Sequence, residues 1–183
     1  MKIYGKYIYL RSLSISDALF TYNLRKNRLN SFYLHKPPKS IKDQKNWIKK
    51  NIKNKQNFDF IIFDRKKSKK IGTIALNNIT KYQAEWGRWI SKGNTIQNIE
   101  PILLLLNYGF KNLKLKRIYS LTNTNNKKVV NFHKNTPAIY NGIIKSFFLI
   151  KNKKADAVKY TFTKKRLTVL KKKFDLMTQL IQL

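Results

Sequence analysis

The sequence contains no cysteine. This absence excludes disulfide bonds, a thiol nucleophile and a metal site with thiolate ligands. Histidine is scarce as well: only His35 and His133 occur, and two side chains so far apart do not predict a zinc site. We therefore expect no bound metal.

Long hydrophobic runs are also missing. The longest, residues 102–106, is too short to span a bilayer, and lysines interrupt the first six residues before any apolar run forms. The sequence therefore predicts a cytoplasmic protein without stable membrane insertion.

Acidic residues are few, with 8 Asp and Glu against 40 Lys and Arg, and the formal net charge is +32. Such a surface attracts polyanions, including nucleic acid, acidic membranes, coenzyme phosphates and nucleotide-linked substrates. Alternatively, abundant Lys, Asn and Ile reflect a genome rich in A and T, and the lysines mark solvated faces. Charge alone therefore does not predict a specific nucleic-acid partner.

What is present is enough apolar material for one core: 42% of the 183 residues are hydrophobic and 13% are aromatic. The length favours a single domain, and we find no linker, repeat or low-complexity block. We expect one domain over residues 1–163. Residues 164–183 are predicted to form a basic amphipathic helix that packs on this domain or contributes to a homodimer.

The first part of the chain predicts a strand over residues 3–12 and two helices. Ser14 with Asp17, and Ser40 with Asp43, are capping-box signatures that begin these helices. Residues 25–39 between them are basic and aromatic and read as a surface loop. The predicted buried faces are Ile15, Ala18, Leu19 and Tyr22 in the first helix, and Ile41, Gln44, Trp47 or Ile48, and Ile52 in the second.

The remaining segments alternate between strands and helices. Strands are predicted over residues 58–63, 71–79, 84–91, 115–121, 139–150 and 157–162, and helices over residues 99–112, 126–134 and from Thr163 onward. This order predicts an α/β (α+β) fold with a mixed, mostly antiparallel central sheet flanked by helices.

Residues 84–133 carry the strongest functional signal. A strand with Glu85 leads through a polar loop into the most apolar helix, and a second strand leads into a helix that Asn126 opens and that carries His133. Two strands that diverge between two helix N-termini expose backbone amides to a ligand. We therefore expect a cleft for a phosphorylated cofactor.

Several short motifs, in a fixed order, carry a family resemblance. They are residues 9–13 with Asp17 and Arg25, then Gln44 with Trp47, then residues 84–87, 105–110 and 126–133. In this order and spacing they resemble the GCN5-related N-acetyltransferase (GNAT) superfamily, in particular its branch of ribosomal-protein and amino-sugar acetyltransferases. The similarity covers the chain from residue 8 to about residue 163.

The resemblance implies an acetyl-CoA-dependent enzyme in which a substrate amine attacks the thioester directly. Proximity and a backbone amide near residues 89–91 would supply most of the acceleration. Glu85 would act as the base, through water. His133 stands where many relatives carry the tyrosine that protonates the leaving thiolate, and we expect it to take that role.

The pyrophosphate loop of the family aligns with residues 93–98, where Ile96 and Asn98 replace expected glycines. Weakened cofactor affinity, a different acyl donor and lost catalysis are the alternatives that this departure leaves open. The expected cofactor contacts are Trp89, Ile90, Ser91, Gln97, Asn98 and Asn126, and the expected acceptor contacts are Arg25, Tyr33, Trp47 and Trp86.

Each of these residues also has a structural interpretation. Glu85 reads equally as an exposed strand residue paired with lysine, His133 as a packing residue and Asn126 as a plain helix cap. Trp86 and Trp89 are also typical of strand core positions.

The sequence leaves three alternative functions open. The first is N-acetylation of a nucleotide-linked amino sugar, the second is acetylation of a protein N-terminus, and the third is a catalytically silent domain that binds polyanions through its lysines.

Overall fold

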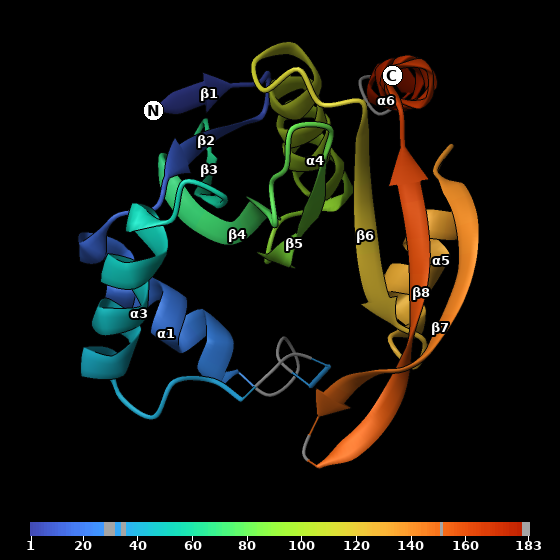
Figure 1. Cartoon of the computed structure of the whole chain (residues 1–183). Coiled ribbons are helices and arrows are strands. Elements are labelled where there is room, and N and C mark those ends of the chain that lie inside the picture. The colour runs from blue at the N-terminus through green and yellow to red at the C-terminus, as the bar shows by residue number, and fades with distance from the viewer. Residues whose placement is uncertain (28–31, 34–35, 151, 181–183) are drawn as a thin grey trace.

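The computed structural model describes residues 1–27, 32–33, 36–150 and 152–180. They form one eight-stranded sheet in the order β1-β2-β3-β4-β5-β6-β8-β7, with helices on both faces (Figure 1). All neighbouring strands are antiparallel except β5 and β6, which are parallel. The predicted mixed, mostly antiparallel α/β fold is confirmed.

The strands are β1 (Lys2–Tyr4), β2 (Ile8–Ser12), β3 (Phe58–Asp64), β4 (Lys69–Asn77), β5 (Gln83–Ser91), β6 (Arg117–Asn123), β7 (Ile139–Ile150) and β8 (Lys153–Phe162). The helices are a 3-10 turn η1 (Ile15–Asp17), then α1 (Ala18–Lys26), α3 (Ile41–Lys53), α4 (Thr95–Lys111), α5 (Lys127–Lys134) and α6 (Lys164–Leu180).

The predicted single strand over residues 3–12 is wrong, because β1 and β2 form a hairpin. Its turn is held from a distance: the carboxylate of Glu100 on α4 accepts backbone N–H bonds from Lys6 at 2.6 Å, Tyr7 at 2.9 Å and Ile8 at 2.8 Å. A Cβ on Gly5 would lie 2.6 Å from this carboxyl carbon, so a larger residue there would displace the carboxylate from its present position. The alternation of apolar and polar residues within residues 3–12 cannot reveal a hydrogen-bond partner that lies 92 residues away in the sequence.

Both capping signatures begin helices as predicted. Ser14 and Asp17 form a capping box on η1, and the Ser40 side chain accepts a bond from the Asp43 amide at 3.1 Å. Asp17 is fully buried and pairs with Arg11 and Lys70. The "LRxLxxxD" pattern thus encodes a buried ion pair that ties β2 to the first helix.

The predicted buried faces of these helices are partly wrong. Helix α1 buries Ala18, Thr21 and Leu24, while Leu19 is 55% exposed. The preceding 3-10 turn has about 3.0 residues per turn, whereas the buried face was predicted with the α-helical period of about 3.6 residues per turn. The difference changes which residues of α1 face the core. Helix α3 buries Ile48 and also the polar side chain of Gln44. Gln44 can be buried because its amide nitrogen donates a hydrogen bond to Thr21 Oγ1 at 2.9 Å.

Helices α4 and α6 cover one face of the sheet and enclose the main core. Phe110 of α4, Phe174 of α6 and alternate residues of β3, Phe60 and Ile62, belong to the same buried cluster. Ile61 points to the other face, which α1 and α3 cover (Figure 1). The predicted amphipathic character of α6 is confirmed, since it buries Leu167, Leu170, Phe174 and Thr178 and exposes its lysines.

Candidate active site

A gap opens between β5 and β6 beside Glu85. The parallel pairing of these strands is limited to Gln83 with Arg117, Ala84 with Ile118, and Glu85 with Tyr119. Beyond that point β5 continues along β4 and β6 continues along β8, and the two strands diverge (Figure 1). Glu85 therefore lies at the vertex of the gap.

A β-bulge reshapes β5 just past this vertex. The register with β4 shifts between Thr73 and Ala75, and Arg88 adopts a left-handed φ of 49°. The Thr73 hydroxyl donates to the Arg88 carbonyl at 2.9 Å. Gly72 opposite is required, because a Cβ there would lie 2.2 Å from the Ile90 carbonyl oxygen. Bulges of this kind redirect a strand next to a site.

A pocket of about 640 Å³ lies on the α1 and α3 side of the gap. It brings together four predicted site residues from distant parts of the chain: Glu85, Arg25, Tyr33 and Trp47. Ile90, predicted to contact the cofactor, also lines it, and Leu121 of β6 completes the wall across the gap. Further lining residues that the sequence did not indicate are Lys36, Asp59, Arg88, Phe147 and Phe148.

Glu85 has the environment of a base. Its Oε2 accepts a hydrogen bond from Asn78 Nδ2 at 3.0 Å. Burial raises the pKa of its carboxyl above 4.5, although the Asn78 hydrogen bond and the charge of Arg88 act in the opposite direction. A carboxylate with a raised pKa is a stronger base.

Arg88 is the main feature of the pocket that sequence reasoning missed. It donates to both oxygens of Asp59, at 2.9 and 3.0 Å, and to Asn51 Oδ1 at 3.0 Å. Its guanidinium carbon lies 5.1 Å from the ring centroid of Trp47. The one available signal was a charged residue between Trp86 and Trp89.

The pocket is cationic as a whole. Besides the Arg88–Asp59 ion pair, the charged residues of the lining are Arg25, Lys36 and Glu85. Burial, followed by the charge of Arg88, lowers the pKa of Arg25 below its ordinary value, so the two guanidinium groups interact in a site of reduced solvation. An acceptor that carries negative charge matches this lining.

The opposite side of β5 carries an aromatic cluster that reaches α5. Trp86 is 3% exposed, and its ring centroid lies 5.9 Å from Trp89 and 5.4 Å from His133. Trp89 in turn lies 5.2 Å from Phe132. Trp86 does not line the pocket that contains Glu85, Arg25 and Trp47, here called the acceptor pocket after the contacts predicted for it, so its placement does not support the predicted acceptor contact.

His133 is 1% exposed and lies in this cluster, not in the Glu85 pocket. Its Nε2 is 3.0 Å from Ser120 Oγ, and its ring stacks on Tyr160 at 4.7 Å. Burial lowers the pKa of His133 to about 4, so the ring is neutral near pH 7. The predicted role of His133 as proton donor stays a prediction. A ring that is neutral near pH 7 weighs against this role, because it lacks the extra proton that an imidazolium would donate.

The predicted pyrophosphate loop is largely a helix cap. Gln97 Oε1 accepts from the Asn94 amide at 3.2 Å, and Asn94 Oδ1 accepts from the Gln97 amide at 3.0 Å. The Gly93 amide donates to Ser91 Oγ at 3.1 Å, and Asn98 Nδ2 donates to the Gly93 carbonyl at 3.0 Å. The side chains of Ser91, Gln97 and Asn98 therefore close the turn.

The remaining features fit the pantetheine arm of acetyl-CoA. The strands β5 and β6 no longer pair beyond Glu85, and among the described residues the buried indole nitrogens of Trp86 and Trp89 have no hydrogen-bond partner. Such N–H groups can donate to the amide carbonyls of a pantetheine chain. Asn126 caps α5 through the Val129 amide at 3.4 Å, and its cofactor contact stays a prediction.

Two further observations concern only the described part of the chain. No three side chains of His, Asp or Glu lie close enough to hold a metal ion there, and no helix there has the length and apolarity needed to cross a membrane. His35 lies outside the described residues.

Comparison with solved structures gives the same fold. A GCN5-related N-acetyltransferase from Brucella melitensis has a TM-score of 0.82 at 19% identity, covering 96% of this chain and 84% of that one. Apo FdhC, described as a nucleotide-linked sugar GNAT, has a TM-score of 0.78 at 27% identity, with 96% and 97% covered. Spermidine N-acetyltransferase from Vibrio cholerae, in complex with CoA and spermine, has a TM-score of 0.79 at 23% identity, with 90% and 99% covered.

No curated protein sequence shows significant similarity to this chain. The sequence profile of the acetyltransferase (GNAT) domain matches residues 8–136, which is more than half of the 183 residues. The chain therefore belongs to the acetyltransferase (GNAT) domain family and is an acyltransferase.

Proposed function

We propose that the protein transfers an acetyl group from acetyl-CoA to the primary amine of a nucleotide-linked amino sugar. The observation that carries the proposal is the pocket that joins Glu85 to Arg25 and Arg88. A base beside fixed cations suits an amine whose carrier is anionic. A cytoplasmic location belongs to the same proposal.

The chemistry follows from the residues around the gap. Acetyl-CoA supplies the activated acyl group. Glu85 takes the proton of the incoming ammonium through water, since only a neutral amine attacks a carbonyl. The amine nitrogen forms the new C–N bond as the C–S bond breaks, the nitrogen then gives up a second proton, and the departing thiolate takes up a proton to become the free thiol of CoA. Residues 89–91 follow the bulge at Arg88 and lie beyond the pairing of β5 with β6, and we expect one of their amides to polarise the thioester carbonyl.

The pocket charge favours this acceptor over a polyamine. Arg25, Arg88 and Lys36 face two carboxylates, and one of these, Asp59, already pairs with Arg88. A polycation such as spermidine would meet this lining and the +32 surface with unfavourable electrostatics. A diphosphate would instead gain charge-assisted hydrogen bonds from the guanidinium groups.

The aromatic side chains of the pocket support a nucleotide carrier. Tyr33, Trp47, Phe147 and Phe148 line it, and Phe147 and Phe148 pack edge-to-face at 4.9 Å. Flat apolar side chains of this kind can contact a nucleobase face.

A thiol-release assay with acetyl-CoA tests the proposal. The acceptors are a uridine diphosphate-linked amino sugar, the same sugar without its nucleotide, a peptide with a free N-terminus, and spermidine. We expect the highest kcat/KM with the nucleotide-linked sugar. Arg25→Ala should raise KM at least about ten-fold for that acceptor and leave KM for the free sugar within about two-fold.

Turnover with peptides and none with amino sugars would instead favour the second function, acetylation of a protein N-terminus. If no acceptor turns over and calorimetry detects no acetyl-CoA binding, a catalytically silent polyanion-binding domain is the better description. In that case binding to nucleic acid should collapse as salt is added.

A further inference from the structure

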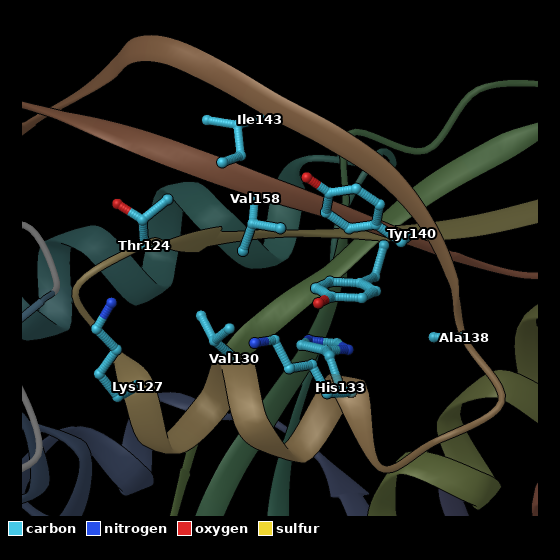
Figure 2. Close-up of a pocket in the computed structure, with 10 residues that line it drawn as sticks. Thr124, Lys127, Val130, His133, Ala138, Tyr140, Ile143 and Val158 are labelled. Atoms are coloured by element: carbon cyan, nitrogen blue, oxygen red, sulfur yellow. The ribbon is translucent and has the colours of Figure 1, made fainter.

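A second cavity, here called the α5 groove, lies between α5 and the β7–β8 hairpin. It encloses about 600 Å³, within the range of small-molecule sites. Figure 2 shows Val130 and His133 rising from α5 toward Tyr140, Val158 and Ile143. The other lining residues are Thr124, Lys127, Lys134, Ala138 and Tyr160.

The α5 groove is separate from the acceptor pocket, with which it shares no lining residue. In the sheet order, β6 lies between β5 and β8, the strand that contributes Val158 and Tyr160 to the groove. His133 forms the partition. Its ring stacks on Tyr160 of the groove and also contacts Trp86 of β5, with centroids 4.7 and 5.4 Å away.

The lining of the groove is apolar with two cations. Val130, Ile143 and Val158 form aliphatic walls, and no acidic residue lines the cavity. Lys127 and Lys134 are exposed at its edge, and neither has an ion-pair partner within the described residues. This combination complements a ligand with an apolar body and an anionic group.

A polar atom in the groove wall also lacks a partner. His133 is 1% exposed, and over the described part of the chain its Nδ1 has no hydrogen bond. A buried ring nitrogen without a partner is costly, so it indicates a group that the protein alone does not supply. The Tyr160 ring, stacked parallel to the imidazole, provides a flat aromatic surface beside it.

We propose that the α5 groove binds a small aromatic anion, such as an aryl carboxylate, as a second site distinct from the acyl-transfer site. The carboxylate pairs with Lys127 and Lys134, and the ring packs on Val130 and Ile143 next to the His133–Tyr160 stack. A bound ligand contacts His133, which links the groove to Trp86, and can therefore alter the aromatic cluster beside the cofactor gap.

A second copy of this chain is a weaker candidate for the same groove. Edge strand β7 is exposed and apolar, with Tyr140 at 58% and Ile143 at 51% exposure. However, two copies meeting here would bring Lys127 and Lys134 of both together on molecules that each carry +32.

Calorimetric titration of the full chain with 2-naphthoate, at fixed ionic strength, tests the proposal. The neutral isostere 2-naphthamide measures the apolar contribution alone. We expect the double variant Lys127→Ala/Lys134→Ala to weaken naphthoate binding at least about ten-fold and naphthamide binding less than about two-fold. Val130→Trp, which fills the groove, should abolish binding of both probes.

The matched control is Lys128→Ala/Lys154→Ala, which removes the same charge from α5 and β8 without touching the groove lining. An equal loss of naphthoate affinity in this control would assign binding to general surface charge and overturn the proposal. Unchanged binding in Val130→Trp would also overturn it. So would a dimer, seen by sedimentation equilibrium, whose formation excludes the probe. None of these readouts depends on acetyl transfer.

Discussion

At the scale of single residues, the position of Glu85 follows from strand geometry. It is the last residue of β5 that pairs with β6, so its side chain lies where the sheet separates. The same position partly buries the carboxylate and raises its pKa. One structural fact thus explains both where the carboxylate lies and why its pKa is raised.

We predict that Glu85→Gln lowers kcat/KM by about 100-fold, the usual contribution of a positioned base. The rate of the variant should also rise more steeply with pH, since only water and hydroxide remain to accept the proton. Initial rates between about pH 6 and about pH 9.5 measure both effects. An unchanged profile would remove Glu85 from the mechanism.

The same variant should be more stable than wild type at neutral pH. Because the folded-state pKa of Glu85 is raised, its contribution to stability is fully present below the unfolded-state pKa and is lost as pH rises through the folded-state pKa. The amide introduced by Glu85→Gln is never charged, so the gain over wild type should shrink as pH falls toward 4.5. Urea unfolding at several pH values checks this sign.

His133 is the second residue whose chemistry depends on burial. Its pKa is about 4 in the folded protein against the ordinary value of 6.5, so between these values the unfolded state binds the proton more tightly. The folded state should therefore lose about 2 kcal/mol of stability between about pH 8 and about pH 5, and His133→Phe should abolish this loss. Urea unfolding of both proteins across this pH range measures the difference.

Kinetics of His133→Phe separate the acid role from a packing role. If the ring protonates the thiolate, kcat falls about 100-fold with little change in acetyl-CoA affinity. If kcat stays within about two-fold and only the pH dependence of stability changes, His133 is a packing residue. Binding calorimetry on the same variant provides the affinity.

The residues that line the pocket could be predicted only where a sequence motif contained them. Glu85, Arg25 and Trp47 line one pocket as the motifs indicated. Arg88 and Phe147 could not be found that way, because their positions depend on long-range geometry. Arg88 lies in the bulge of β5, opposite the stretch of β4 between Thr73 and Ala75, and Phe147 follows Ser146, whose φ of 52° lies where the pairing of β7 with β8 is interrupted.

At the scale of elements, periodicity identified the helices and strands better than their faces. Segments such as α5 and β3 appear within a few residues of their predicted bounds. The β1–β2 turn escaped prediction because Glu100, on a distant helix, supplies its hydrogen bonds. A local pattern holds no information about such a partner.

The first turn of α4 leads to a prediction about the cofactor. Its capping bonds between Asn94 and Gln97 occupy backbone amides that a phosphate loop would offer to its ligand. Ile96 is also buried, with 9% exposure, and its side chain belongs to the core. The native turn therefore favours helix stability over phosphate binding.

We predict that Ile96→Gly/Asn98→Gly tightens acetyl-CoA binding, because glycine lets backbone amides approach the pyrophosphate. The variant should also lose stability, by about 1 kcal/mol per helical glycine plus the lost packing of Ile96. Calorimetry at a temperature well below the lowered Tm measures the affinity. Unchanged affinity would mean that other groups hold the cofactor.

At the scale of the whole molecule, the charge of +32 acts on every anionic ligand at once. The exposed lysines of α6 and the guanidinium groups of the acceptor pocket contribute to one positive potential. Such a potential raises the local concentration of anions and their association rates, without changing the chemistry at the vertex of the gap. Steering and catalysis should therefore respond differently to salt.

We predict that KM for acetyl-CoA rises several-fold when ionic strength increases from about 0.01 M to about 0.1 M, as the Debye length falls from about 30 Å to about 10 Å. The value of kcat should stay within about two-fold, because Glu85 and the gap are partly shielded from solvent. Steady-state rates in sodium chloride measure both constants, and a neutral osmolyte of equal osmolality is the control. A parallel fall in kcat would show that salt alters the folded site itself, and an unchanged KM would show that the surface lysines are solvated charges without a role in ligand capture.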